Sequence, residues 1–268
     1  MQYVRFAREE GLNVSQALAV AGLPDDPAHA GLNHVGGTVF QRFLKALIES
    51  SGDPLLGLRS GQYVQPGSYS TLGYLVMTCS TLGEAVALIA PFEKLVGDMG
   101  VTRILDDGDT IELRWHCNYT DPAVRPHMMA NVLASWTEYA RWLAAQPASP
   151  TRVRFPFTID AALLPHYERV FGCPLEDKSD CCAIRIARHL LEAPLRQPDA
   201  RLKTTLLQAA SEQIEALSSE QVSFSEQVRA VIRQQLDQGV IRRDVVAEAF
   251  GLSVRTLVRR LQDAGTSY

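Results

Sequence analysis

The stretch "VVAEAFGLSVRTLVRRL", residues 245–261, constrains the fold of this chain more than any other segment. Ala247 is a small residue inside one predicted helix, and Gly251 follows four residues later, where the chain must turn. Ser253 stands where a second helix would begin, and its hydroxyl can accept a hydrogen bond from the first turn of that helix. The spacing therefore predicts a helix-turn-helix.

The two faces of this segment differ in chemistry. The positions at which the two helices would touch are apolar: Val246, Phe250, Leu252, Leu257 and Leu261. The second helix presents no acid between Ser253 and Leu261. In the major groove of DNA, arginine can bind guanine through two hydrogen bonds, and an apolar side chain can contact a thymine methyl group. We therefore expect a DNA-binding surface formed by Ser253, Arg255, Thr256, Val258 and Arg259. A solvated helical hairpin is the alternative.

The charge of the chain supports this interpretation only locally. The whole chain carries a net charge of −4, which argues against a general affinity for nucleic acid. Residues 222–268 contain seven arginines and five acids, a net charge of +2. No apolar run reaches the about 18 residues of a membrane span. The charged start "MQYVRFAREEG" is unlike a secretory signal, so we expect a cytoplasmic protein with reduced cysteines.

The first half of the chain changes from a helical to a strand pattern. Residues 1–60 are expected to be helical, and "LGYLVMT" (72–78) is expected to be a strand. Thr81 and Glu84 then form a capping box for a helix that reaches about Val96. Residues 101–119 predict a hairpin with its turn at 107–108, because Asp-Gly joins two alternating segments. A long helix is expected from about Ala123 to Ala145.

The same order is expected to recur further along the chain. "RVRFPF" (152–157) and "CCAIRIA" (181–187) predict strands, and "DAALLPHYERVFG" (160–172) predicts a helix between them. The fold class is therefore α/β (α+β), possibly with duplicated β-α-β-β units, followed by an all-helical C-terminal part. Prolines in 193–200 mark a boundary. We expect domains at 1–198 and 222–268, joined by a linker helix at 199–221, with "SSEQVS" (218–223) ending that helix.

A second Ala-x-x-x-Gly spacing occurs near the start, at Ala7 and Gly11. Glu10 occupies a position where a helix-turn-helix needs an apolar contact, and the helix that follows has no cation. We therefore interpret this segment as a structural pair of helices.

Taken with its continuation, "VVAEAFGLSVRTLVRRLQDAGTSY" resembles the first helix-turn-helix of the AraC/XylS transcription regulators. That family has the pattern Ser-x-Arg-x-Leu-x-Arg-x-Leu followed by Gly-x-Ser-aromatic, matched here by "SVRTLVRRL" and "GTSY". The runs "GDPLLGLRSG", "LGYL", "TLGEA", "YERVFGCPLE" and "ARHLLEAPL" resemble the arabinose-binding type of N-terminal domain. The resemblance implies that Arg255, Val258 and Arg259 face base edges, with Thr256 nearby. Arg260 departs from the apolar residue usual at its position.

Members of that family carry two helix-turn-helix units, and this chain ends at the first. We expect a chain truncated after its first unit, with poor affinity for DNA because half of the contacts are missing. The partners implied are an operator in double-stranded DNA, bound in the major groove, an unknown small-molecule effector and a second copy in a homodimer. No membrane partner is expected.

The N-terminal domain is expected to hold the effector. The candidate residues are Trp115, His116 and Tyr119 on the hairpin, and His127, Asn131, Ser135 and Trp136 on the following helix. The alternative is structural: a tryptophan on an alternating strand is more often part of the core, and a histidine near a proline turn is more often simply exposed.

Catalysis is not expected. His116 and Cys117 are neighbours on one strand and so point to opposite faces, which separates a nucleophile from a base. His116, Cys117 and His127 have no spacing specific for a metal, and no catalytic metal or cofactor is expected. We therefore expect an effector-responsive DNA-binding transcription regulator. The alternative is a small-molecule-binding or dimerisation module with no DNA-binding function of its own.

Overall fold

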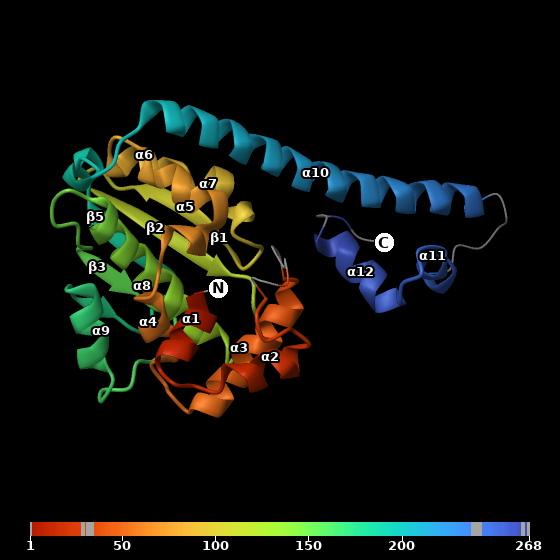
Figure 1. Ribbon diagram of the computed structural model, residues 1–268, viewed down its shortest axis with the longest axis horizontal. Helices are drawn as coiled ribbons and strands as arrows, with labels where there is room; N and C mark the ends of the chain where they lie inside the picture. The colour runs from red at the N-terminus through yellow and green to blue at the C-terminus, as the bar shows by residue number, and fades with distance from the viewer. Residues whose placement is uncertain (1, 28–29, 31–34, 237–242, 264–265, 267–268) are drawn as a thin grey trace. The chain divides into compact units, whose positions relative to one another are not determined.

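The computed structural model describes residues 2–27, 30, 35–236, 243–263 and 266. Its contacts divide the chain into two compact units, Met1–Ala210 and Ser211–Tyr268. Helix α10, Ala200–Leu236, passes from the first unit into the second (Figure 1). Each unit is described by itself.

Four helices open the first unit. They are α1 (Gln2–Glu9), α2 (Val14–Ala21), α3 (Gly37–Ser51) and α4 (Leu56–Gly61). The side chain of Asn13 caps α2 by accepting a hydrogen bond from the backbone of Gln16. Helices α1 and α2 form a structural pair as expected, since both contribute to the core of the first unit. Glu10, just after α1, pairs with Arg59 of α4 and accepts a hydrogen bond from the Tyr63 hydroxyl.

The next segment is helical where a strand was expected. It contains a 3₁₀ turn at Pro66–Tyr69, α5 (Ser70–Met77), α6 (Leu82–Ala87), α7 (Ile89–Phe92) and a 3₁₀ turn at Glu93–Leu95. The strand prediction for 72–78 is wrong. Leu72, Leu75 and Val76 are buried at helical spacing, and a short apolar run does not distinguish a strand from a buried helix. Thr81 caps α6 as predicted, but the helix expected to reach Val96 is divided into these shorter pieces.

A five-stranded sheet follows. Its strands are β1 (Gly100–Asp106), β2 (Thr110–Cys117), β3 (Arg152–Arg154), β4 (Leu175–Glu176) and β5 (Cys182–Ala187). The order is β1-β2-β5-β3-β4, with only β3 and β4 parallel. The predicted hairpin is confirmed, and Gly108 has the positive φ, 72°, that its turn requires. Because 72–78 contains no strand, the described residues have the β-α-β-β order once, as β3-α9-β4-β5, and do not form the duplicated units.

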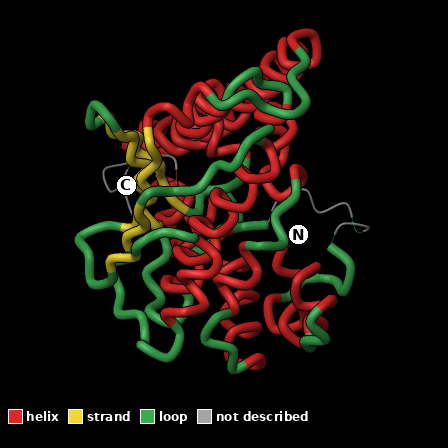
Figure 2. The backbone as a smooth tube through the Cα atoms, turned by 90° about the vertical axis from the view of Figure 1, so that its left-hand side faces the viewer, coloured by secondary structure: helices red, strands yellow, loops and turns green. Residues whose placement is uncertain are grey.

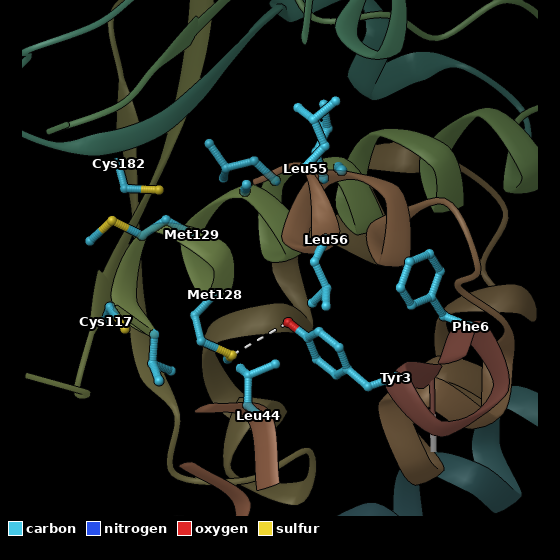
Figure 3. Close-up of a cluster of buried hydrophobic side chains, with 14 of the residues drawn as sticks. Tyr3, Phe6, Leu44, Leu55, Leu56, Cys117, Met128, Met129 and Cys182 are labelled. Carbon is cyan, nitrogen blue, oxygen red and sulfur yellow. Dashed lines mark hydrogen bonds between the residues drawn. The ribbon is translucent and has the colours of Figure 1, made fainter. Parts of the chain in front are cut away.

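Helices cover one side of this sheet (Figure 2). They include α8 (Arg125–Leu143), close to its predicted range, and α9 (Leu164–Phe171), which ends at Gly172 as predicted. A short 3₁₀ turn, Arg188–Glu192, follows β5. Ile111, Leu113, Trp115 and Cys117 of β2 are buried on the helix-covered side, in the core that includes the residues of Figure 3.

Helix α4 approaches α8 unusually closely. A Cβ on Gly57 would lie 2.2 Å from the carbonyl oxygen of His127, and one on Gly61 would lie 2.5 Å from Cβ of Ala134. Across the same contact, the Gln2 side chain donates hydrogen bonds to the Ser60 carbonyl at 2.6 Å and to the Ser135 hydroxyl at 2.9 Å. Two glycines four residues apart thus allow α4 to pack directly on the backbone of α8.

The second unit comprises the later part of α10 with α11 (Arg243–Ala249) and α12 (Val254–Asp263). The break expected at 218–223 is absent, because α10 continues through it. That segment has no glycine or proline; its serines weaken a helix only slightly, and its glutamate and glutamine favour one.

We predict that Gly57→Ala lowers the free energy of unfolding by about 2–3 kcal/mol, because the added methyl group meets the backbone of α8 and not a flexible side chain. Urea denaturation measures the effect. Gly36→Ala is the control, since a Cβ there meets nothing within 4 Å. Equal losses in the two variants would show that the helix crossing tolerates the methyl group.

Glu112 of β2 lies on the side of the sheet opposite the helices, and its side chain is only 2% exposed. Burial opposes its ionisation, but hydrogen bonds from Arg114 and Arg185 outweigh burial and lower the pKa of Glu112. A lowered pKa stabilises the fold above the unfolded-state value, about 4.3, and this stabilisation is lost as the pH falls through the folded-state pKa.

We therefore expect Glu112→Gln to lower the free energy of unfolding by about 1–2 kcal/mol at pH 7, since both arginines are partly screened by solvent. The difference from wild type should shrink below about pH 4. Urea titrations across this range test it, and a difference independent of pH would contradict the assignment.

Candidate functional site

A cavity of about 400 Å³ lies within the first unit. The helix-covered side of the sheet forms one wall through Thr102, Leu113 and Trp115. Helix α8 forms another, and the remaining walls come from α1–α3 and from the segment that runs from Ser68 to Asp98. Its lining is mostly apolar, as in small-molecule sites.

Five of the seven predicted ligand residues line this cavity. Trp115 comes from β2, Tyr119 follows that strand, and α8 contributes Asn131, Ser135 and Trp136. These five residues lie together because β2 and α8 each form a wall of the cavity. The residues are carried by one face of β2, its continuation and one face of α8. Their role as ligand contacts stays a prediction.

The two predicted histidines lie elsewhere. His116 is exposed on the opposite side of the sheet from Trp115. His127 accepts a hydrogen bond from the Gly57 backbone N–H at its Nδ1, 3.2 Å away. Burial lowers the pKa of His127, which favours the neutral ring that this acceptor role requires. His127 therefore supports the contact between α4 and α8.

Some of the polar groups around the cavity already have partners. Asn131 donates a hydrogen bond to the Ser60 hydroxyl at 2.9 Å, and Ser135 accepts one from Gln2. Tyr139 donates to the Gly73 carbonyl at 2.8 Å. The hydroxyl of Tyr69, by contrast, is buried without a hydrogen-bond partner among the described residues, although Ser135 lies near it.

Glu93 is a further lining residue that the sequence analysis missed. Its two carboxylate oxygens accept hydrogen bonds from the Thr102 backbone N–H at 3.1 and 2.8 Å. Burial raises the pKa of Glu93. The sequence predicted one continuous helix through this residue and so gave no reason to place it near β1. In the structure, the 3₁₀ turn after α7 brings Glu93 to β1.

The groups considered for catalysis are separated. Cys117 is buried, with a pKa raised by burial, whereas His116 is exposed on the other side of the sheet. In the part of the chain that the structure describes, no cluster of three histidine, cysteine or acidic side chains could hold a metal ion. None of the described helices combines the length and hydropathy of a membrane span.

The second unit contains the predicted helix-turn-helix surface. Gly251 makes the turn with φ of 62°, and the Ser253 hydroxyl accepts the Thr256 backbone N–H at 3.2 Å as the N-cap of α12. Arg255 and Arg259 are exposed on α12, whereas Val258 is partly buried. Gly265, Ser267 and Tyr268 of the expected motif lie outside the described residues.

A small core holds α12 in place. Val246, Ala247, Leu257 and Leu261 are buried with Val228 of α10, and Phe224 packs against them. The guanidinium of Arg260 lies 5.3 Å from the centre of the Phe224 ring. Arg260, unusual for its position by the family pattern, thus covers an aromatic ring at the edge of the core.

Three comparisons bear on the family. The model described as "Arabinose-binding domain of AraC transcription regulator, N-term" matches residues 11–195, more than half of the chain. The ornithine utilization regulator of Pseudomonas aeruginosa is 26% identical over 221 residues, which cover 81% of this chain and 63% of that protein. The crystal structure of the transcriptional regulator CdpR from Pseudomonas aeruginosa superposes with a TM-score of 0.56 and 20% identity, over 95% of this chain and 79% of CdpR.

The likeness to CdpR shows a common fold, and the match to the ornithine utilization regulator spans less than two thirds of that protein's length. The match of the N-terminal domain over most of the first unit decides the family. This chain belongs to the AraC-type transcription regulators with an arabinose-binding-type N-terminal domain.

Proposed function

We propose that this protein is an effector-responsive regulator of transcription that acts in the cytoplasm and binds operator DNA through α12. The observation that carries the proposal is the exposed pair Arg255 and Arg259 on a helix whose opposite face is fixed in a core. The first unit of the same chain encloses a cavity of ligand size. No catalytic step is part of this function.

The arrangement of α12 suits the major groove. Arg255 is near the N-terminus of the helix, one turn before Arg259, so both can project toward the same groove. Val258 between them can contact a thymine methyl group, and Ser253 and Thr256 are placed for phosphates or base edges at the helix start. Arg260 belongs to a different surface because it covers Phe224.

Helix α10 connects α6, which lines the cavity, to the core behind α12. Leu82 and Ala85 of α6 line the cavity, and Glu84 of the same helix pairs with Lys203 at the start of α10, 2.7 Å apart. Helix α10 then continues to Phe224 and Val228, which belong to the core behind α12. A ligand that shifts α6 would therefore favour one position of α10 over another.

We also propose a homodimer formed mainly by residues 1–221, because regulators that read repeated half-sites are commonly two-fold symmetric. Leu202, near the start of α10, is 47% exposed, so its side chain is accessible to a contact with a second copy.

The DNA surface is tested with duplexes that the wild-type protein selects from a randomised pool at low salt. We expect Arg255→Ala and Arg259→Ala each to reduce preference for the selected duplex over a scrambled one by about 1–3 kcal/mol, since each removes a contact to a base. Competition binding measures this preference.

Arg260→Ala is the matched control on the same helix. It should lower the thermal stability of the protein through loss of its contact with Phe224, and it should leave the preference between the two duplexes unchanged. Equal losses on both duplexes for Arg255→Ala and Arg259→Ala would assign these arginines to phosphates. A wild-type protein that selects no sequence would favour a ligand-binding or dimerisation module.

The dimer is tested by sedimentation at micromolar concentration. We expect the wild-type protein to sediment as a dimer and Leu202→Lys to sediment as a folded monomer, because a charge at an apolar contact opposes association without disturbing a core. A folded, monomeric wild-type protein would refute the proposal, and a dimeric Leu202→Lys variant would place the interface elsewhere.

A further inference from the structure

The ionisable residues that line the cavity have one sign of charge. Glu93 and Asp98 are its acids, and no lysine, arginine or histidine is among the described residues that line it. The rest of the lining is largely aliphatic and aromatic. A ligand enclosed here therefore meets negative charge in a mainly apolar environment, where opposite charges interact more strongly than in water.

Glu93 has capacity for a further partner. Its hydrogen bonds come from a single residue, Thr102, through the backbone N–H and the side chain, and no ion pair involves Glu93 in the described part of the chain. Each carboxylate oxygen can accept more than one hydrogen bond. The raised pKa caused by its burial has the direction expected of a carboxylate that lacks a counter-ion.

Tyr69 is a second polar residue in the lining of the same cavity. Its buried hydroxyl has no partner among the described residues, and burial raises its pKa, so the group remains a neutral phenol. A neutral hydroxyl retains lone pairs that can accept a hydrogen bond from an ammonium group. Leaving this hydroxyl unpaired in an apolar site is unfavourable, and a donor on a ligand would relieve that cost.

Aromatic rings complete the chemistry. Trp115, Tyr119 and Trp136 line the same cavity. The faces of such rings attract cations, and the attraction grows when the cation is removed from water. Carboxylate and aromatic groups together are the combination that recognises an organic cation.

We infer that the cavity takes an apolar organic cation, an amine with an aromatic or aliphatic body, and that Glu93 is its counter-charge. This inference rests on the proposed function, because it identifies the chemical class of the effector. The same cavity discriminates against organic carboxylates, which would meet two acids and no described cation. A zwitterionic amino acid is disfavoured for the same reason, since its carboxylate would lack a partner.

Three probes that share one body and differ in charge test the inference on the whole chain: 4-phenylbutylamine, 4-phenylbutan-1-ol and 4-phenylbutanoate. Isothermal titration calorimetry at pH 7 measures each affinity. We expect the amine to bind about tenfold more tightly than the alcohol, because a hydrogen bond to a charged group is stronger than a neutral one. The carboxylate should bind more weakly than the alcohol.

Glu93→Gln keeps the size of the side chain and removes its charge. In this variant the amine and the alcohol should bind within about twofold of each other, with the affinity for the alcohol unchanged. Glu49→Gln on the exposed surface of α3 removes the same charge away from the cavity and should preserve the preference for the amine. Circular dichroism melts confirm that both variants are folded.

The outcomes separate the inference from the proposed function. Equal binding of all three probes, a preference for the carboxylate, or a preference for the amine that survives in Glu93→Gln would overturn the inference while the cavity remained a ligand site. Failure of every probe to bind at millimolar concentration would overturn the inference and remove the support that the cavity lends to an effector.

Discussion

The close contact between α4 and α8 is the constraint on which the first unit depends. Gly57 and Gly61 bring two backbones together, and His127, Gln2 and Ser135 supply hydrogen bonds across the contact. This contact fixes the position of α8, which carries Asn131, Ser135 and Trp136 to the cavity. A side chain at either glycine would move the helix that forms this wall.

The sheet then separates two electrostatic environments. On its helix-covered side, the cavity is lined by Glu93 and Asp98 among apolar groups. On its other side, the buried Glu112 carboxylate is paired with Arg114 and Arg185, and Arg154 lies close by. The period-two alternation of a strand makes this possible, because neighbouring residues of β2 face opposite environments. The Glu112 carboxylate is thus paired with arginines on one side of the sheet, whereas Glu93 on the other side has no ion pair among the described residues.

The second unit depends on a segment that also belongs to the linker. Phe224 and Val228 of α10 complete the core of α11 and α12, and two short helices alone would bury too little apolar surface to be stable. The helix that leaves the first unit thus supplies part of the support for α12, the helix proposed to bind DNA. This shared element gives the proposed effector response a structural basis.

The features determined by the sequence alone are local ones. The turn at Gly251, the cap at Ser253, the hairpin at Gly108 and the alternation of β2 follow from the φ preference of glycine, the hydrogen bonding of serine and the pleat of a strand. The family pattern was recognisable for the same reason, because its motifs are contiguous. Five cavity residues were also found, since they lie on two adjacent elements.

Only the tertiary structure decided the rest. Residues 72–77 are helical because packing, and not the period of a short apolar run, determines their state. Glu93 and Tyr69 reach the cavity from segments whose turns carry no clear signal, and Phe224 joins a core with Val246 and Leu257, which lie more than twenty positions away. Contacts between distant segments depend on how elements pack in three dimensions, and neither hydrophobic period nor residue preference records that arrangement.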